Sequence, residues 1–170
     1  KPGPGLGGHC LPIDPFYLSW KAREYGVSAE FVELAGRTNT NMPRFATERA
    51  METLNKAGVA TSNAEIAVLG VSYKPDVGDL RESPALEIME QLAALGATLS
   101  YHDAHVDELP SFGLSSEPLD EILARADLAL IVTAHSAVDY TEVVESAKLV
   151  LDFRGVTRGL DVESAKVVRL

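Results

Sequence analysis

From residue 64 onward, short apolar runs alternate with stretches of helical periodicity. The predicted strands are 65–69, 97–101, 128–132, 149–152 and an edge strand at 167–170. The predicted helices between them are 84–95, 119–126 and 141–147. Such alternation is typical of a parallel sheet with helices on both faces. We therefore expect an α/β chain: a helical segment over 1–58, followed by a doubly wound parallel sheet over 64–170.

The first helix of the chain follows a loop rich in Gly and Pro, residues 1–13. Asp14 and Pro15 are typical of a helix start, with Asp as the N-cap and Pro as the first helical residue. The helix is predicted to run to about Tyr25 and to end at Gly26, because glycine commonly terminates helices.

A second helix is predicted to begin after Ser28 as its cap. Its apolar residues share one face before and after Pro43; the first of them are Phe31, Leu34 and Ala35. Pro43 should kink or split the helix near Asn41, because proline removes a helical hydrogen bond. Residues 58–63 are predicted to form a linker.

Composition excludes several classes of protein. The formal net charge of −10 argues against non-specific nucleic-acid binding, which depends on clustered Lys and Arg. No apolar run approaches the ~20 residues of a membrane-spanning helix, and no signal peptide is recognised. A single cysteine forms no intrachain disulfide, which fits a cytoplasmic protein. The chain opens without Met in the middle of a loop, so we expect a piece of a longer protein.

Three cations follow the predicted strands of this acidic chain: Lys74, Arg81 and Arg154. Ligands of open parallel sheets bind at the carboxyl ends of the strands. Helix N-termini at Pro84 and near Thr141 are expected at the same edge, where they favour anions. The pattern indicates a site for a phosphate-bearing ligand; the alternative is that these are ordinary solvated loop charges.

Gly3, Gly5 and Gly8 match the spacing G-x-G-x-x-G of dinucleotide-binding loops. No strand precedes them, and Cys10-Leu11-Pro12 rather than a helix is expected to follow, so the context of that fingerprint is missing. We interpret these glycines as positions where backbone N–H groups approach a ligand closely.

Cys10 is the only thiol of the chain. A lone cysteine is commonly a small buried apolar residue. Here it lies in a glycine-rich loop just before a helix, which can present the thiol to a ligand and favour thiolate. Asp14, explained as a cap, can take a second role one turn away, whereas His9 alone is a weak signal.

Three segments resemble the UDP-glucose/GDP-mannose dehydrogenase family. Residues 5–15 (GLGGHCLPIDP) are similar to its active-site cysteine motif. Residues 70–84 (GVSYKPDVGDLRESP) are similar to the signature opening its C-terminal domain, and residues 151–154 (LDFR) to an Asp-x-Arg near the end of that domain. The family has an N-terminal Rossmann domain for NAD, a central helical region that dimerises, and a C-terminal Rossmann-like domain for the nucleotide sugar. This chain resembles only the last two, because the NAD fingerprint and the family residues preceding the cysteine motif are absent.

The resemblance implies oxidation of a sugar C6 alcohol to a carboxylate with NAD as cofactor, a UDP-sugar as substrate and a homodimer formed through the central helices. It implies these roles: Cys10 as nucleophile, Asp14 in proton movement and water activation, Gly5, Leu6, Gly7 and Gly8 along the sugar-phosphate, Lys74 at the substrate, Arg154 at the nucleotide, and Arg81 at the NAD pyrophosphate.

Residues 9–18 resemble the branch acting on UDP-N-acetylhexosamines more than the UDP-glucose branch, which tends to have Lys where this chain has Ile13. UDP-GlcNAc, UDP-ManNAc and UDP-glucose all stay open as substrates. Two alternatives also remain: a module that binds nucleotide sugar without catalysis, and an α/β domain in which the cysteine is inert.

Overall fold

The computed structural model describes residues 3–160 and 166–169. Its helices are α1 (Cys10–Glu24), α2 (Glu30–Lys56), the 3-10 turn η1 (Thr61–Asn63), α3 (Pro84–Ala94), α4 (Leu119–Arg125) and α5 (Tyr140–Ser146). Its strands are β1 (Glu65–Leu69), β2 (Thr98–His102), β3 (Glu108–Leu109), β4 (Leu114–Ser115), β5 (Leu128–Ile131), β6 (Val150–Asp152) and β7 (Val167–Arg169).

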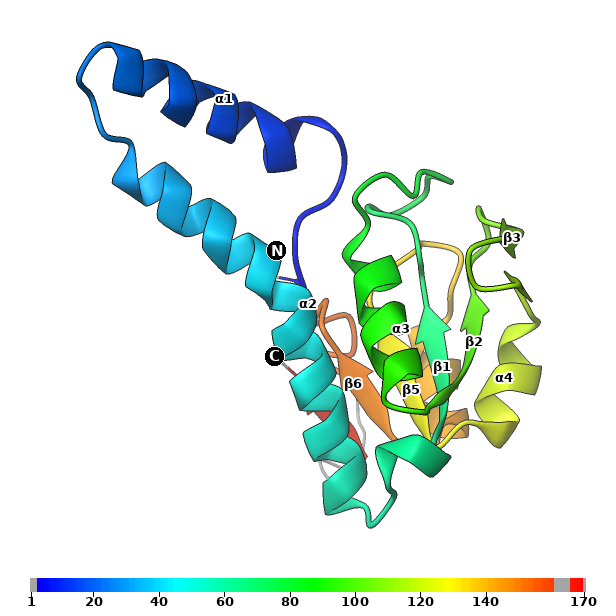
Figure 1. The fold of residues 1–170 in the computed structure, drawn as a ribbon. Coiled ribbons are helices and arrows are strands. Elements are labelled where there is room, and N and C mark those ends of the chain that lie inside the picture. Colours follow the sequence, from blue (N-terminus) through cyan, green and yellow to red (C-terminus); the bar gives the residue numbers. More distant parts are fainter. Residues whose placement is uncertain (1–2, 161–165, 170) are drawn as a thin grey trace.

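Five strands form one parallel sheet in the order β2-β1-β5-β6-β7 (Figure 1). The central strand β1 pairs with β2 and β5 on its two sides, for example Ala67 with Ser100 and with Ala129. After β1 the chain forms β2 on one side of it and then crosses to form β5 on the other side. The crevice where ligands bind in such sheets therefore lies at the carboxyl ends of β1 and β5. The predicted α/β fold with a doubly wound parallel sheet is confirmed.

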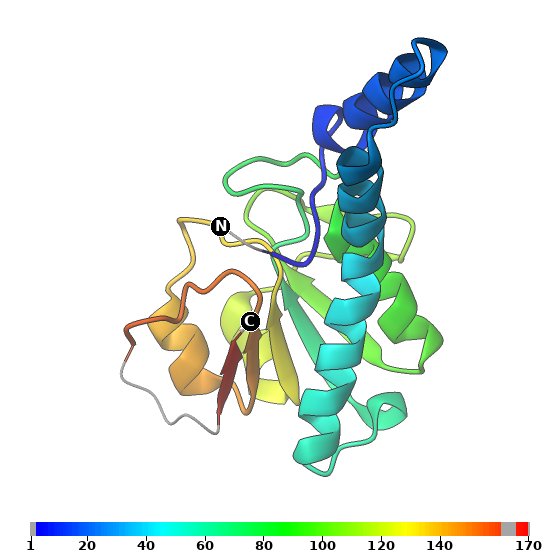
Figure 2. The same cartoon turned by 90° about the vertical axis from the view of Figure 1, so that its left-hand side faces the viewer.

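Helices cover both faces of the sheet (Figures 1 and 2). Alternate strand residues point to opposite faces: Ile66 and Val68 pack with α2 and α3, whereas Ala67 and Leu69 pack with α4 and α5. Both faces of the central strands are thus fully apolar, which is why these segments appear as continuous hydrophobic runs in the sequence.

The start of α1 differs from the prediction. The helix begins at Cys10 with His9 as its N-cap, so Asp14 lies inside it and is not the cap. Pro12 falls in the first turn, where the N–H groups have no partner within the helix, so only Pro15 costs a helical hydrogen bond. The helix ends at Glu24 with Gly26 at φ +72°, as predicted.

The helix α2 is continuous through Pro43, and its N-cap is Ala29 rather than Ser28. In Figure 1 it changes direction near its middle without breaking. Its C-terminal half packs on the sheet through Ala46, Ala50 and Leu54, which are fully buried. Its N-terminal half pairs with α1, and the two helices project away from the sheet (Figures 1 and 2).

The short antiparallel pair β3–β4 was not predicted. The five strands of the main sheet and helices α3 to α5 lie within one residue of the predicted bounds, except for the last residue of the edge strand, Leu170, which falls outside the described residues. Among the described residues, no helix combines the length and apolar character needed to cross a bilayer.

Candidate functional site

The glycine loop, residues 3–9, crosses the carboxyl edge of the sheet. At one end, a Cβ added to Gly3 would collide with the guanidinium of Arg154. At the other end, a Cβ on Gly7 would lie 2.7 Å from the Cβ of Tyr73 and would strike the carbonyl of Glu82. Glycine is therefore required at Gly7, where backbone lies in the way, whereas at Gly3 the flexible tip of Arg154 could move aside. The approach of the loop backbone to a ligand stays a prediction.

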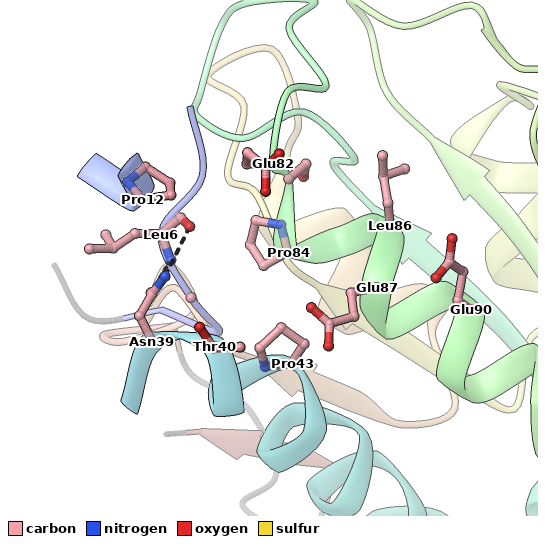
Figure 3. A pocket seen from close by; sticks show the side chains of 12 residues that line it. Leu6, Pro12, Asn39, Thr40, Pro43, Glu82, Pro84, Leu86, Glu87 and Glu90 are labelled. Carbon is pink, nitrogen blue, oxygen red and sulfur yellow. Dashed lines mark hydrogen bonds between the residues drawn. The ribbon is translucent and has the colours of Figure 1, made fainter. Parts of the chain in front are cut away.

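Hydrogen bonds fix the glycine loop to two elements. Leu6 N donates to Asn39 Oδ1 (2.7 Å), and Asn39 Nδ2 donates to Leu6 O (3.3 Å). Figure 3 shows this pair between the loop and α2. Gly8 N donates to Arg81 O (2.9 Å), which ties the loop to the segment after β1. The loop thus bridges α2 and the sheet edge immediately before Cys10.

Cys10 is the first residue of α1, and its side chain is exposed. Helix N-termini carry partial positive charge, which favours an anionic group there. Asp14 is also exposed and lies four residues later, so the two side chains share one face of α1. The structure therefore presents the thiol and the carboxylate together, next to the glycine loop.

The three predicted cations are exposed or half-buried at the carboxyl edge of the sheet. Arg81 forms an ion pair with Asp79 at 2.6 Å. This guanidinium holds the pKa of Asp79 at about 2. The pKa of Arg81 is raised, mainly by the hydrogen bond and the charge of Asp79.

Lys74 and Arg154 differ from Arg81 in having no carboxylate partner. The Lys74 ammonium lies 5.3 Å from the ring centre of Tyr73, and neither cation makes an ion pair with a described residue. Most other cations in the described ranges pair with Asp or Glu, for example Lys148 with Asp127. Two unpaired positive charges beside a glycine loop, in a chain of net charge −10, can accept an anionic ligand.

The predicted helix N-terminus near Thr141 is not free for a ligand. Asp139 caps α5 and accepts hydrogen bonds from Thr141 N (2.8 Å) and Glu142 N (3.4 Å). A carboxylate therefore already occupies the position that an anion would take. At α3, Ser83 is the cap, and Glu82 and Glu87 lie beside it.

A buried polar network holds the segment that carries Lys74. Asp103, after β2, accepts hydrogen bonds from Val71 N (2.8 Å) and Ser72 N (3.2 Å). His135, after β5, lies between Asp103 and Asp76. Its Nε2 is 3.0 Å from Asp103 Oδ2. Its Nδ1 accepts from Asp76 N (3.0 Å). No role is predicted from the sequence for Asp103 or His135, whose only signal is that each lies just after a predicted strand.

These distances assign the tautomer of His135 and indicate that Asp103 is ionised. Because Nδ1 of His135 accepts a hydrogen bond, the ring proton lies on Nε2 and is donated to Asp103. Burial opposes ionisation of Asp103, but hydrogen bonds from His135, His105 N and Val71 N outweigh it and lower the pKa of that carboxyl.

The lowered pKa of Asp103 predicts loss of stability in acid. A carboxyl whose pKa is lower in the folded state contributes stability that is fully present above its unfolded value, about 3.9, and is lost as pH falls through the folded-state pKa. In urea titrations between about pH 6 and pH 3, wild type should exceed Asp103→Asn in unfolding free energy. That difference should shrink as the pH falls; a constant difference would contradict the prediction.

Asp76, His105 and His135 form the metal-type cluster found among the described residues, with candidate ligand atoms within 4.8 Å of one another. However, Nδ1 of His135 already accepts the Asp76 N–H, and Asp76 Oδ1 accepts from Ser136 N (2.8 Å). The lone pair of His135 that a metal would need is thus used within the fold, so we interpret the cluster as structural.

Two cavities flank the glycine loop. One, of about 580 Å³, lies between the loop, α2 and the start of α3 (Figure 3). It is lined by Glu82, Glu87 and Glu90, which disfavour a phosphate. The other, of about 620 Å³, is lined mainly by apolar groups and by Arg154. The second combination suits a ligand with a flat apolar part and an anionic part.

Sequence models of two domains match the chain. Residues 67–159 match the UDP-binding domain of the UDP-glucose/GDP-mannose dehydrogenase family, and residues 1–41 match its central domain. A UDP-N-acetyl-D-mannosamine dehydrogenase from Methanococcus maripaludis is 36% identical over 81% of this chain and 30% of its own length. The CapL protein of Staphylococcus aureus is 32% identical over 90% of this chain and 38% of its own length.

A solved structure of UDP-D-ManNAc dehydrogenase from Pyrococcus horikoshii superposes with a TM-score of 0.81 at 29% identity, covering 99% of this chain and 39% of that one. The chain thus spans between about a third and two fifths of the proteins that it matches. The resemblance seen in the sequence motifs is confirmed: the chain belongs to the UDP-glucose/GDP-mannose dehydrogenase family.

Proposed function

We propose that this chain is the substrate-side portion of an NAD-dependent nucleotide-sugar 6-dehydrogenase that oxidises the sugar C6 alcohol to a carboxylate. The observation that carries the proposal is the glycine loop, which joins the exposed Cys10 to a sheet edge bearing the unpaired cations Lys74 and Arg154. Several relatives are named UDP-N-acetyl-D-mannosamine dehydrogenase, so UDP-ManNAc is the first substrate to test.

Each residue of the site has a chemical task in this proposal. Lys74 and Arg154 neutralise the charge of the nucleotide sugar, and the glycine loop lies along its phosphates. After C6 has become an aldehyde, the Cys10 thiolate adds to it and forms a thiohemiacetal. Loss of a second hydride gives a thioester, which water cleaves to the carboxylate and free thiol. Asp14, on the same face of α1, accepts the thiol proton when Cys10 ionises and returns it to the C6 oxygen after the addition. In the hydrolysis step it accepts a proton from the attacking water.

The chain offers a residue that could contact NAD but no dinucleotide-binding fingerprint. Gly3, Gly5 and Gly8 lie in a loop that leads into α1 and packs on protein atoms, so they do not form a dinucleotide fingerprint. Arg81 is exposed, and its backbone carbonyl accepts from Gly8 N two residues before Cys10, so its guanidinium is available for a contact to the pyrophosphate. Two NAD molecules, bound one after the other, would each accept one hydride. We place the main NAD-binding site in a domain outside these residues.

We also propose that residues 1–58 form a central domain and residues 64–170 a nucleotide-sugar domain. The proposed location is the cytoplasm. The competing function is a module that binds nucleotide sugars without catalysis. The complete enzyme, assayed with NAD and each of UDP-ManNAc, UDP-GlcNAc and UDP-glucose, separates the two. NADH formation supports the dehydrogenase; binding without NADH formation supports the module.

Lys74→Ala tests the binding half of the proposal. The change should weaken binding of UDP-ManNAc by about 1–3 kcal/mol, the scale of one charge-assisted hydrogen bond. Titration calorimetry measures this. Lys148→Ala is the matched control, because Lys148 is equally a surface lysine but follows α5 at the opposite edge of the sheet. Equal effects of the two substitutions would refute a direct role for Lys74.

We propose further that the enzyme is a homodimer formed through α1 and α2. Phe31 is 88% exposed and Trp20 60% exposed, and both lie on the helices that project from the sheet. Exposed large apolar groups in such a cluster are typical of an interface.

Phe31→Asp should therefore shift the protein from dimer to monomer in analytical ultracentrifugation. Leu95→Asp is the control, since Leu95 is 40% exposed at the end of α3 and belongs to neither α1 nor α2. A dimer that survives Phe31→Asp unchanged would place the interface elsewhere.

A further inference from the structure

The segment that carries Lys74 has little regular structure of its own. Between the end of β1 and the start of α3, the described chain has no helix or strand. Its position must therefore come from outside contacts, since an unsupported loop samples many conformations.

Side chains from two other strand ends supply those contacts. Asp103 accepts from Val71 N and Ser72 N, and Thr133 Oγ1 donates to Ser72 O (2.6 Å). His135 accepts from Asp76 N (3.0 Å). The backbone on both sides of Lys74 is thus held by groups that belong to β2 and β5.

His135 joins the two halves of this support. Its Nε2 donates a hydrogen bond to Asp103, which holds the backbone before Lys74. Its Nδ1 accepts a hydrogen bond from the backbone N–H of Asp76, which follows Lys74. Both side chains are almost completely buried, 1% exposed for His135 and 0% for Asp103. Low dielectric strengthens such bonds and makes the loss of one partner costly.

We infer that the Asp103–His135 pair is a positioning device for Lys74 and so sets the affinity for the nucleotide sugar. This inference rests on the proposed function, because it concerns the substrate assigned there. His135 touches no ligand in this scheme; it acts through the backbone that presents the lysine.

Two substitutions separate the bonds of His135. His135→Asn keeps an acceptor near the position of Nδ1 and loses the link to Asp103. His135→Gln keeps a donor near the position of Nε2 and loses the acceptor for Asp76 N–H. We expect each to weaken binding of UDP-ManNAc about tenfold, the scale of one lost buried hydrogen bond transmitted to the lysine.

A double-mutant cycle with Lys74→Ala provides the decisive measurement. If His135 acts through Lys74, the tenfold effect should fall to less than about twofold in the Lys74→Ala background. Thr157→Val is the control: Thr157 is fully buried and donates to Asp152 at the loop of Arg154. Its effect on binding should be the same with and without Lys74.

The outcomes distinguish this inference from the proposed function. If Lys74→Ala leaves the affinity for UDP-ManNAc unchanged, the role of Lys74 fails and the inference fails with it. If Lys74→Ala weakens binding but the His135 effects are absent or fully additive, only the inference fails. Should either His135 variant not fold, Thr133→Val, which removes the bond to Ser72 O, is measured in the same cycle and must show the same loss of effect.

Discussion

Cys10→Ser should abolish formation of the carboxylate while leaving the nucleotide sugar bound. A serine hydroxyl is a far weaker nucleophile than a thiolate at neutral pH, so addition to the aldehyde becomes slow. We expect turnover in the complete enzyme to fall by about 10³-fold or more, the scale found when a catalytic nucleophile is removed. The affinity for UDP-ManNAc should change little, because Lys74, Arg154 and the glycine loop are untouched.

The exposed thiol makes this prediction easy to check in two independent ways. Cys10 is exposed, so iodoacetamide should label it, and peptide mass mapping locates the label at this residue. UDP-ManNAc should slow that labelling, since the sugar would cover the thiol. Near-normal carboxylate production by Cys10→Ser would overturn the thiohemiacetal route and leave Cys10 an inert residue.

The sheet could be predicted because its strands are buried on both faces. Residues 65–69 and 128–131 are apolar at nearly every position, since α2 and α3 cover one face and α4 and α5 the other. The pair β3–β4 was missed because its strands have two residues each, too few to show any periodicity.

The start of α1 was misplaced because Asp14-Pro15 is a genuine start signal in isolation. The structure begins the helix earlier because Gly8 is tied to Arg81 and the loop packs on Tyr73, so the chain emerges already oriented for the helix at Cys10. This correction matters for function. It puts Cys10 and Asp14 on one helical face, whereas the prediction left Cys10 in the loop.

Sequence pattern alone does not predict the order of the strands in the sheet. It therefore does not predict which strand ends lie together. Asp103 and Thr133 lie 31 and 61 residues after Ser72 in the sequence, yet both bond the backbone of Ser72. Asn39 was missed for the same reason: its bonds to Leu6 span 33 residues. A polar side chain directly after a strand was the available signal for Asp103 and Thr133, but nothing in the sequence indicated the partner.

Gly70→Ala should be among the most destabilising single changes in the chain. Gly70 has φ +78°, and a Cβ there would collide with the backbone carbonyl of Thr133, which cannot swing away as a side-chain tip could. The left-handed conformation costs an alanine roughly 1–2 kcal/mol, and overpacking in a rigid core adds roughly 1–3 kcal/mol. We therefore expect a loss of about 2–5 kcal/mol in the free energy of unfolding.

Gly113→Ala separates the two contributions, because Gly113 has φ +64° but no atom within 4 Å of an added Cβ. It should cost only the conformational part, about 1–2 kcal/mol. Urea denaturation measures the free energy of unfolding of both variants. If Gly70→Ala does not fold, its loss exceeds the whole stability of the wild type, which agrees with the expected direction. Equal losses would mean that the carbonyl of Thr133 yields freely. The junction of β1 with the loop would then be softer than its buried hydrogen bonds imply, and a rigid support for Lys74 would be untenable.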